Sequence, residues 1–507
     1  MSGVALSTLV DQGIASRVVG DGSVVVQGVQ HDSRAVRAGD LFVAIRGERF
    51  DGTSFASQAV QQGASAVLAD TELAGLSVPV AVVPDARRAL GAAADVVYAH
   101  PTDRLATIGI TGTNGKTTTV WLTEAAIRGA GGRPAVLGTL GARGPAGELP
   151  GLHTTPEADD ILRFARASLD ANATHLVMEV SSHGLALHRV DAVRFRVAAF
   201  TNLTQDHLDF HGDLGAYGQA KARLFTELEP DVAVLNVDDP FGARLAEQVT
   251  CPRWRCSRRS DVEAEVRVLD RTASRDGIRA RVATPGGEVE LSSPLVGEHN
   301  LDNALVAFGC ALALGLDASA VVDALRTATG APGRLERVAH PGGVAVFVDY
   351  AHTPDALERV LAALRPITPG RLVTVFGCGG DRDRAKRAPM GAAVGRAADL
   401  AVLTSDNPRT EDPARIVADT EPGLVQAGVV RCEPGELADA QRAYAVEPDR
   451  RAAIRWAVRM ARPGDTVLIA GKGHEDYLEV GTEKRPFDDR VEARRAIESG
   501  TARGGQA

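Results

Sequence analysis

The chain has 507 residues, of which 44% are hydrophobic and 24% charged, a balance typical of globular proteins and unlike that of disordered or fibrous ones. The 65 acidic residues exceed the 56 basic ones and give a net charge of −9, which argues against a broad nucleic-acid-binding surface. The sequence has neither an apolar run long enough to span a membrane nor a leader-like N-terminus, and its five cysteines are scattered, so we expect a cytoplasmic protein without membrane insertion.

The first predicted domain covers residues 1–103. At about 150 residues per domain, the length predicts roughly three domains in all. Short β-rich runs at 24–26 and 41–45 stand between turn residues such as Gly39, Asp40 and Gly47. This pattern predicts a small α/β domain.

The second predicted domain covers residues 104–333. An apolar run, LATIGI, is followed by the glycine loop TGTNGKT and by a segment with helical spacing, TTTVWLTEAAIRGAG. Further strands are predicted at 135–137, 175–180, 197–200 and 232–235, so strands alternate with helices around a mostly parallel sheet. Between 263 and 296, short alternating runs around Pro285, Gly286 and Gly287 predict a small antiparallel subsheet attached to it.

A third series of strands and helices predicts a C-terminal domain over residues 334–507. Its strands are expected at 344–348, 372–376, 400–403 and 466–469, and the joint with the second domain is placed near Gly333. The predicted fold class is therefore α/β with three domains.

The glycine loop is the first candidate for chemistry. It lies between a strand and a helix, where backbone amides and the helix N-terminus can hold phosphate. Lys116 would reach the outer phosphates and Thr117 would offer its hydroxyl to Mg²⁺, so ATP or GTP binding is predicted. The strict Walker spacing needs a glycine where this chain has Ile110, and the alternative is a plain glycine turn before a helix.

Three more side chains are candidates around that loop. Glu179 ends a predicted strand, where open α/β sheets bind ligands, and its carboxylate could hold a metal ion. His207 also follows a strand and could give a neutral imidazole to Mg²⁺ or Mn²⁺. The plain alternatives are a solvated strand-end carboxylate, a structural histidine and, for Lys221, a surface lysine on an amphipathic helix.

Short motifs run along nearly the whole chain. They are HDSRAVRAGDLFVAIRG (31–47), TGTNGKTT (111–118), HTTP (153–156), MEVSSHGLALHRV (178–190), TNLTQDHLDFHGDLGAYGQAKARLF (201–225), GEHNLDNALVA (297–307), PGRLERV (332–338), DYAHTPDAL (349–357), GCGGDRDRAKR (377–387), SDNPRTEDP (405–413) and AGKGHEDY (470–477). In this order they resemble the Mur ligase family, and within it the MurE type. One departure is Leu187, where many family members carry glutamine.

The resemblance implies an N-terminal domain that binds the UDP end of a substrate, a central P-loop ATPase domain, and a C-terminal Rossmann-like domain that binds an amino acid. It implies that CO₂ converts Lys221 to N6-carboxylysine, whose carbamate organises Mg²⁺ together with Glu179 and His207. The implied catalytic residues are Lys116, His207 and Lys221, and the implied metal ligands are Thr117, Glu179, His207 and Lys221. The implied contacts are, for the UDP substrate, Ser33, His153, Thr154, Thr155, Ser181 and Arg189, and for ATP, Gly112, Thr113, Asn114, Gly115, Lys116, Thr117, Thr118, Asn300, Asn303, Arg334 and Asp349.

The choice of amino acid is expected to rest on the DNPR segment. Its members are Asp406, Asn407, Pro408 and Arg409. Diaminopimelate differs from lysine by a second carboxylate, which a guanidinium fork recognises with two hydrogen bonds, so Arg409 favours diaminopimelate. Family correspondence adds Arg382, Gly471 and Glu475, the last suited to pair with an ammonium group. The alternative for DNPR is a simple Asn-Pro turn at a strand end.

The resemblance therefore implies an ATP-dependent amide ligase that adds diaminopimelate to UDP-N-acetylmuramoyl-L-alanyl-D-glutamate through an acyl phosphate, in peptidoglycan precursor synthesis. We expect a monomer whose only partners are these small molecules. Three alternatives stay open: another amide ligase, such as the D-alanyl-D-alanine-adding type or a folylpolyglutamate synthase; a P-loop nucleotide switch; and an inactive scaffold. The DNPR and GKGHEDY segments weigh against the first, and the Glu179, His207 and Lys221 set against the second.

Overall fold

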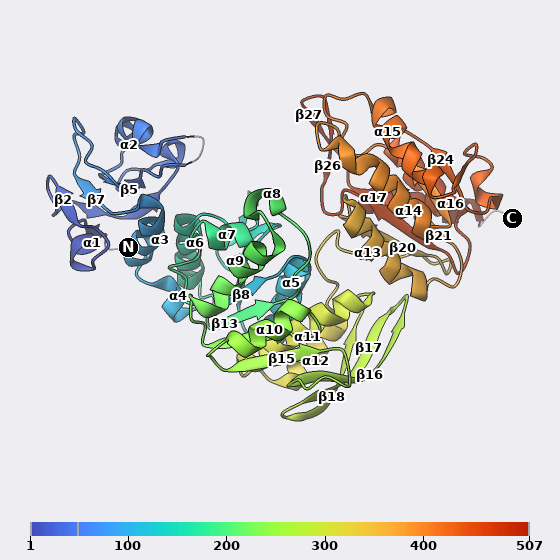
Figure 1. Ribbon diagram of the computed structural model, residues 1–507, viewed down its shortest axis with the longest axis horizontal. Helices are drawn as coiled ribbons and strands as arrows, with labels where there is room; N and C mark the ends of the chain where they lie inside the picture. The colour runs from blue at the N-terminus through green and yellow to red at the C-terminus, as the bar shows by residue number, and fades with distance from the viewer. Residues whose placement is uncertain (1–2, 48–49, 152, 505–507) are drawn as a thin grey trace. The chain divides into compact units, whose positions relative to one another are not determined.

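The computed structural model of the protein describes residues 3–47, 50–151 and 153–504 (Figure 1). It divides into two compact units, one formed by residues 1–270, 281–291 and 302–326, the other by residues 271–280, 292–301 and 327–507. The predicted domain limits, 1–103, 104–333 and 334–507, stay predictions.

A five-stranded sheet of order β2-β7-β6-β5-β4 forms the N-terminal region. Strands β4 to β7 run parallel, and β2 pairs with β7 in the antiparallel sense. Its core joins strand residues such as Leu41 and Leu68 to Leu90 of helix α3. The elements are β1 Val4–Ala5, α1 Thr8–Asp11, β2 Arg17–Val19, β3 Val25–Val26, β4 Gly28–Gln30, β5 Asp40–Val43, α2 Ala56–Gln62, β6 Ala66–Ala69, β7 Val80–Val82, α3 Ala86–Val97 and α4 Pro101–Arg104.

An eleven-stranded sheet follows, with the order β11-β10-β9-β12-β8-β13-β14-β15-β16-β17-β18. Strands β9, β12, β8, β13, β14 and β15 run parallel, as predicted, because helices return the chain between them. The elements are β8 Ala106–Thr111, α5 Lys116–Gly129, β9 Pro134–Gly138, β10 Gly141–Gly144, β11 Gly147–Leu149, α6 Ala158–Asp170, β12 His175–Glu179, α7 Ser182–Ala186, β13 Val197–Phe200, α8 Leu208–His211, α9 Leu214–Thr226, β14 Val232–Asn236, α10 Pro240–Gln248, β15 Arg253–Ser257, β16 Val266–Ser274, β17 Gly277–Thr284, β18 Gly287–Ser293, α11 Glu298–Ala313 and α12 Ala318–Thr327.

The register of this sheet brings three strand ends together. Strand β8 lies between β12 and β13, with Glu179 opposite Ile110 and Phe200 opposite Thr111. Parallel strands end at one edge of a sheet, so the loop after Thr111, the carboxylate of Glu179 and the segment after Phe200 share that edge. The adjacency of β12, β8 and β13 is a property of the topology, which the sequence did not specify.

The C-terminal sheet has seven strands in the order β19-β20-β25-β21-β22-β24-β23, all parallel except β19. The predicted strands are confirmed to within a residue. The elements are β19 Glu336–Val338, β20 Ala345–Asp349, α13 Pro354–Leu364, β21 Leu372–Phe376, α14 Arg387–Ala397, β22 Leu400–Leu403, α15 Pro413–Gln426, β23 Val430–Arg431, β24 Ala443–Val446, α16 Arg450–Met460, β25 Thr466–Ala470, β26 Tyr477–Val480, β27 Glu483–Pro486 and α17 Asp489–Gly504.

Alternate residues of these strands face two separate cores. Phe347 packs with Leu357 of α13 and Met390 of α14, whereas Val346 packs with Ile454 of α16 and Ala493 of α17. A strand buried on both faces needs apolar residues at consecutive positions, which explains runs such as AVFV and LAVL. Both faces of the sheet are therefore covered by packed helices, and the polar groups lie on the loops at the ends of the strands.

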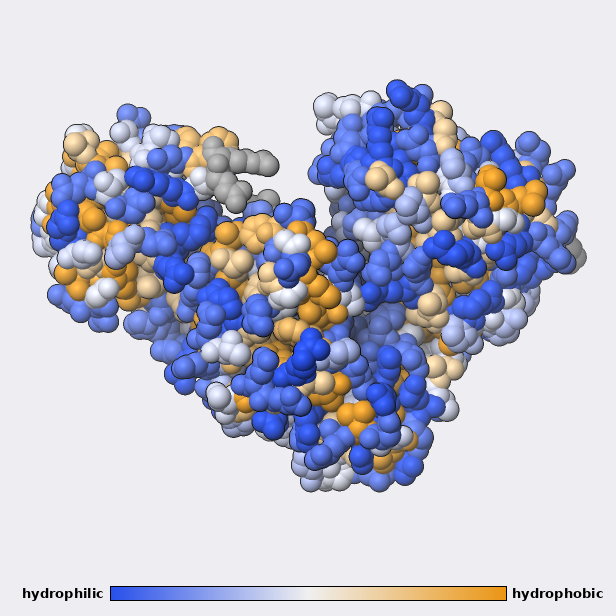
Figure 2. Space-filling view, in the orientation of Figure 1, coloured by the Kyte–Doolittle hydropathy of each residue, from blue (hydrophilic) through white to orange (hydrophobic). Residues whose placement is uncertain are grey.

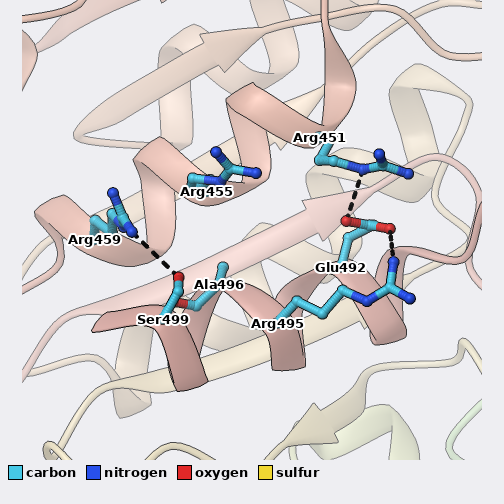
Figure 3. Close-up of a pocket in the computed structure, with 7 residues that line it drawn as sticks. All are labelled: Arg451, Arg455, Arg459, Glu492, Arg495, Ala496 and Ser499. Carbon is cyan, nitrogen blue, oxygen red and sulfur yellow. Dashed lines mark hydrogen bonds and ion pairs between the residues drawn. The ribbon is translucent and has the colours of Figure 1, made fainter. Parts of the chain in front are cut away.

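The surface is mainly hydrophilic in the view of Figure 2, with scattered hydrophobic residues. Among the described residues, every helix is too short or too polar to cross a membrane. A pocket between α16 and α17 is lined by four arginines, one glutamate and two small residues (Figure 3): Arg451, Arg455, Arg459, Arg495, Glu492, Ala496 and Ser499. It contains none of the residues predicted to bind a substrate.

Candidate active site

Two glycines shape the phosphate loop. Gly112 has φ +147° and Gly115 has φ +85°, which side chains rarely adopt. A Cβ at Gly112 would meet the Thr201 hydroxyl and the backbone of Asn202, and one at Gly115 would meet the Asn303 side chain. Asn303, predicted to border ATP, is thus packed directly against the loop.

The loop is anchored to the segment that follows β13. The Thr113 amide donates to the carbonyl of Asn202 at 2.7 Å, and the Asn114 amide donates to Asn202 Oδ1 at 3.0 Å. The Thr201 hydroxyl donates to the Asn114 carbonyl at 2.6 Å. These bonds fix the backbone of the loop, so its remaining amides do not have to reorganise to meet phosphate.

Two lysines converge on one carbonyl of the loop. Lys116 Nζ donates to the carbonyls of Gly112, at 3.0 Å, and Thr113, at 2.8 Å. Lys221 Nζ donates to the same Gly112 carbonyl at 2.8 Å and lies 4.3 Å from the ring centroid of Tyr217. Lys221 is 1% exposed, which excludes the surface-lysine alternative. Burial, together with the charge of Lys116, holds the pKa of the Lys221 amine well below its usual value.

Glu179 is a buried carboxylate held by neutral donors. Thr139 donates its amide to Oε1 at 2.9 Å and its hydroxyl to Oε2 at 3.2 Å, and the Thr117 hydroxyl donates to Oε2 at 3.1 Å. Glu179 is 2% exposed, and none of the ion pairs found among residues 3–47, 50–151 and 153–504 includes it. A buried carboxylate without a cation, next to the Thr117 hydroxyl, is a set of hard oxygen donors that fits Mg²⁺.

His207 stands in a cluster of rings that the sequence did not reveal. Its ring centroid lies 4.8 Å from that of His183 and 6.1 Å from that of Tyr217. His211 lies 5.5 Å from His183 and bonds to the Ser182 hydroxyl at 3.0 Å. His207 is half-exposed, and its φ of +52° marks the tight turn at the start of α8.

The HTTP segment and the end of β12 are joined by hydrogen bonds. The Thr155 hydroxyl donates to the carbonyl of Glu179 at 2.9 Å and accepts from the Ser181 amide at 2.9 Å. Arg189 donates to the Thr155 carbonyl at 2.9 Å and pairs with Glu157 at 2.9 Å. The structure thus brings together Thr155, Ser181 and Arg189, three of the residues predicted to bind the UDP substrate.

Three other predicted substrate residues are placed as follows. The Thr154 hydroxyl lies 3.1 Å from that of Thr139, which contacts Glu179. His153 is exposed. Ser33 is buried in the N-terminal region, where its hydroxyl donates to Gln58 Oε1 at 3.5 Å.

A separate group of ligand-type side chains lies where helix α6 meets the N-terminal region. His31 Nδ1 lies 2.9 Å from both carboxylate oxygens of Asp159, and Asp160 is adjacent. One nitrogen of His31 and one carboxylate oxygen from each of Asp159 and Asp160 all lie within 4.8 Å of one another, close enough to be considered as metal ligands. The His31–Asp159 ion pair accounts for it, and it includes no predicted metal ligand.

The other residues predicted to border ATP belong to the second unit. Asn300 donates to the Val296 carbonyl at 2.9 Å. Arg334 lies 4.7 Å above the ring of Tyr350, and its Nε is a buried atom without a hydrogen-bond partner among the described residues. Asp349 accepts from the amides of Leu335, at 2.7 Å, and Ala351, at 2.8 Å, and burial raises the pKa of its carboxyl.

The DNPR segment follows β22, and its side chains and backbone contact two other loops in addition to forming a turn. Arg409 pairs with Glu479 through Nε at 2.9 Å and donates to the Gly380 carbonyl through Nη1 at 2.8 Å. Its backbone bonds the β26–β27 hairpin, with Arg409 N donating to the Glu479 carbonyl at 3.0 Å. Nη2 has no partner among the described residues, so one edge of the guanidinium group is available to a ligand. Asp406, Asn407 and Pro408 are buried.

The GKGHE segment after β25 meets the DNPR segment. Asn407 Nδ2 donates to Glu475 Oε2 at 2.9 Å. Lys472, which is 0% exposed, donates to Asn407 Oδ1 at 2.9 Å and to Glu475 Oε2 at 3.1 Å. Gly471 turns the chain with φ +119°, and a Cβ there would lie 2.7 Å from Asp406 Oδ2. Four of the predicted amino-acid-binding residues are therefore in one network.

Arg382 lies on the loop after β21. Arg382 is exposed and donates to the carbonyl of Asp381 at 3.3 Å. The loop is anchored by Arg387, 1% exposed, which bonds Glu411 at 2.8 Å and the Gly379 carbonyl at 3.4 Å. Arg382 is thus free to reorient, while its loop is fixed.

Sequence reasoning missed Thr139, His183 and Lys472. Each is an ordinary residue in the sequence, and only the strand order or the meeting of two loops gives it polar partners. The one available signal was the position of Lys472 between Gly471 and Glu475, which were both named. A lysine in a loop is normally exposed, which concealed it.

Comparison with known families agrees with this geometry. Three family models match consecutive parts of the chain: the Mur ligase family, catalytic domain, at residues 25–107; the Mur ligase middle domain at 110–311; and the Mur ligase, glutamate ligase domain, at 333–473. Together they cover most of the chain, including the phosphate loop, Glu179, His207, Lys221 and the DNPR segment.

Similar proteins extend over the full length. A UDP-N-acetylmuramoyl-L-alanyl-D-glutamate--2,6-diaminopimelate ligase from Geobacter metallireducens is 46% identical over 96% of this chain and 97% of its own, and one from Streptomyces coelicolor is 44% identical over 98% and 97%. A solved structure of such a ligase is 35% identical, with a TM-score of 0.72 over 98% of this chain and 99% of its own. MurF from Acinetobacter baumannii, 20% identical with a TM-score of 0.64 over 98% and 99%, shares the fold. This chain therefore belongs to the Mur ligase family, among the ligases of the MurE type.

Proposed function

We propose that this protein is an ATP-dependent ligase that joins diaminopimelate to UDP-N-acetylmuramoyl-L-alanyl-D-glutamate in peptidoglycan precursor synthesis. The observation that carries the proposal is the network of the second unit, where Arg409 and Glu475 are both held to Asn407 and its neighbours. A guanidinium group and a carboxylate in one site complement a substrate that bears both carboxylate and ammonium groups. The relatives that match nearly the whole chain carry the same activity in their names.

The amino acid would be selected by two opposite charges. The open edge of Arg409 would take the distal carboxylate of diaminopimelate, and Glu475 would take an ammonium group. Arg382, Asp406, Pro408 and Gly471 would complete the walls of the site. L-Lysine lacks the distal carboxylate, so it leaves the guanidinium group without its partner and binds less well.

The phosphates of ATP would lie on the amides of residues 112–118. Lys116 would move from the loop carbonyls to the outer phosphates, where its charge offsets that of the transferred group. Asn303 would hold the nucleotide beside Gly115. Asn300, Arg334 and Asp349 stay predicted ATP contacts. The buried Nε of Arg334 offers a donor that is still unsatisfied among the described residues.

The reaction would proceed in two displacements. An oxygen of the D-glutamate γ-carboxylate attacks the γ-phosphorus of ATP, and ADP leaves with the electron pair of the broken P–O bond. The diaminopimelate amine then attacks the acyl phosphate, loses a proton and expels inorganic phosphate, which leaves the amide. The protein contributes mainly by positioning and by neutralising charge. Ser33, His153, Thr154, Thr155, Ser181 and Arg189 would hold the nucleotide sugar peptide in place.

Mg²⁺ would be held by Thr117, Glu179, His207 and a modified Lys221. Glu179 and Thr117 fit it, because a buried carboxylate without a cation lies within hydrogen-bond distance of a hydroxyl. When bound, the ion neutralises charge on the phosphates. His207, which is half-exposed, would turn toward the loop to join Glu179 and Thr117.

Lys221 would react with CO₂ to give N6-carboxylysine. The neutral amine attacks the carbon of CO₂, the N–C bond forms as one C=O π bond breaks with its electron pair moving to oxygen, and one proton leaves the nitrogen to water. The burial of Lys221 and its contact with the loop beside Lys116 favour this product, since a carbamate replaces a second cation by an anion that pairs with Lys116. Labelling with ¹³C-bicarbonate tests it: a carbamate ¹³C signal is expected in the native protein and absent in Lys221→Ala.

Phosphate release by purified protein tests the function directly. The assay contains ATP, Mg²⁺, the UDP-linked dipeptide and, in turn, meso-diaminopimelate, LL-diaminopimelate, L-lysine or D-alanyl-D-alanine, with the product identified by mass spectrometry. Stimulation by one diaminopimelate isomer is expected. Stimulation only by lysine would contradict the role given to Arg409, and hydrolysis indifferent to all four would point to a nucleotide switch.

A further inference from the structure

Lys472 is a fully buried cation in the loop that follows β25. It follows β25 and the Gly471 turn, is 0% exposed, and its ammonium group contacts three side chains. Nζ lies 2.9 Å from Asn407 Oδ1, 3.1 Å from Glu475 Oε2 and 3.8 Å from Asp406 Oδ1. Each of these three is predicted to bind the amino acid, whereas Lys472 itself is not.

The burial of Lys472 has to be compensated. An unpaired ammonium group costs several kcal/mol to bury, so it persists only where anions and acceptors meet it. Here two carboxylates, Asp406 and Glu475, face one cation, which leaves one net negative charge. A site with one net negative charge is complementary to an ammonium group of a ligand.

The two carboxylate oxygens of Glu475 differ in their hydrogen bonds. Oε2 accepts from both Lys472 Nζ and Asn407 Nδ2. Oε1 has no hydrogen-bond partner among the described residues. Asn407 is itself fixed, because its Oδ1 accepts from the amide of Glu479 at 2.9 Å as well as from Lys472.

We propose that Lys472 is a positioning residue for amino-acid binding: its ammonium group holds Glu475 Oε2 and Asn407 Oδ1 and offsets one of the two carboxylates, so that Oε1 is presented as the acceptor for the ammonium group of the incoming amino acid. The inference rests on the proposed function, because it assumes that Glu475 meets the amino acid. Lys472 touches no substrate in this scheme.

Replacing Lys472 by methionine keeps the length of the side chain and removes its charge. The buried Asp406 and the partly buried Glu475 then lose the cation that both contact, which favours protonation of one of them at higher pH. The other charged or titratable groups near them are Arg409 with Glu479, Arg450 with Asp489, and the tyrosines Tyr350 and Tyr477. Neither arginine is released by the change, since each keeps its own carboxylate. A protonated Glu475 cannot accept from an ammonium group as an anion does.

The test uses the full-length protein and steady-state kinetics with diaminopimelate, ATP and the UDP-linked dipeptide. For Lys472→Met we expect the KM for diaminopimelate to rise by about 10- to 100-fold, as for one charge-assisted hydrogen bond, with the KM for ATP within about threefold of the native value. The acid limb of kcat/KM for diaminopimelate should move to higher pH. An unchanged KM for diaminopimelate, an equal rise in the KM for ATP, or an unmoved acid limb would each overturn the proposal.

A double mutant separates charge from contact. Lys472→Met combined with Asp406→Asn removes one cation and one carboxylate, so the acid limb should return toward that of the native protein while the KM stays raised, because Oε2 still lacks a donor. This variant also serves if Lys472→Met alone does not fold, and a native KM in it would overturn the proposal. Arg455→Met, at an exposed arginine of α16 in the pocket of Figure 3, is the matched control and should leave both KM values unchanged. Failure of the proposed function itself would be visible earlier, as native protein that diaminopimelate does not stimulate.

Discussion

Replacing Arg409 by methionine should reduce the preference for diaminopimelate over lysine. Two donors of the guanidinium group already contact the protein: Nε pairs with Glu479, and Nη1 donates to the Gly380 carbonyl. The hydrogens of Nη2 and the second hydrogen of Nη1 are left for a substrate carboxylate. Two charge-assisted bonds of this kind are together worth roughly 2–4 kcal/mol. At 1.36 kcal/mol per tenfold, the expected loss in kcat/KM for diaminopimelate is about 30- to 900-fold.

Lysine provides the internal comparison, because it has no distal carboxylate to lose. Its kcat/KM, measured by phosphate release, should fall by no more than about threefold in Arg409→Met. The left-handed backbone of residue 409 is retained by methionine as by arginine, so the change tests the charge. Equal losses for both amino acids would show that Arg409 acts by supporting the β26–β27 hairpin, and the proposed recognition would be wrong.

Three further predictions concern the first unit. Gly112→Ala should cost about 1–3 kcal/mol of stability through its left-handed φ and its clash with the Thr201 hydroxyl, so calorimetry should give a lower Tm, and an unchanged Tm would contradict the loop geometry. Glu179→Gln should raise the Mg²⁺ concentration that gives half-maximal activity by at least about tenfold, whereas an unaltered Mg²⁺ dependence would remove Glu179 from the metal site. Burial lowers the pKa of His31, but the hydrogen bond and charge of Asp159 outweigh it and raise that pKa. Stability from this pair is therefore fully present below pH 6.5 and lost as the pH rises through the folded value, so His31→Gln should destabilise the protein at pH 6 and have little effect at pH 9; an equal effect at both would refute the ion pair.

Most of the fold was determined by local patterns of the sequence. Consecutive apolar runs such as AVFV and LAVL predicted strands, and the structure buries these strands on both faces of the sheet. The phosphate loop was equally local, since its glycines, lysine and threonine are adjacent in sequence and lie between β8 and α5. The α/β fold class was therefore predicted from the apolar strand runs and from the strand–loop–helix pattern of the phosphate loop.

The tertiary structure decided what those elements meet. Lys221 and Lys472 look like solvated lysines in the sequence, and they are buried because α9 packs toward the phosphate loop and because the loops after β22 and β25 converge. The charge state and partners of such groups depend on strands that are distant in sequence but adjacent in a sheet, as β12, β8 and β13 are. Side-chain identity is local, whereas burial and pairing are properties of the topology; the sequence alone therefore named candidate residues, and the tertiary structure determined which of them share a site.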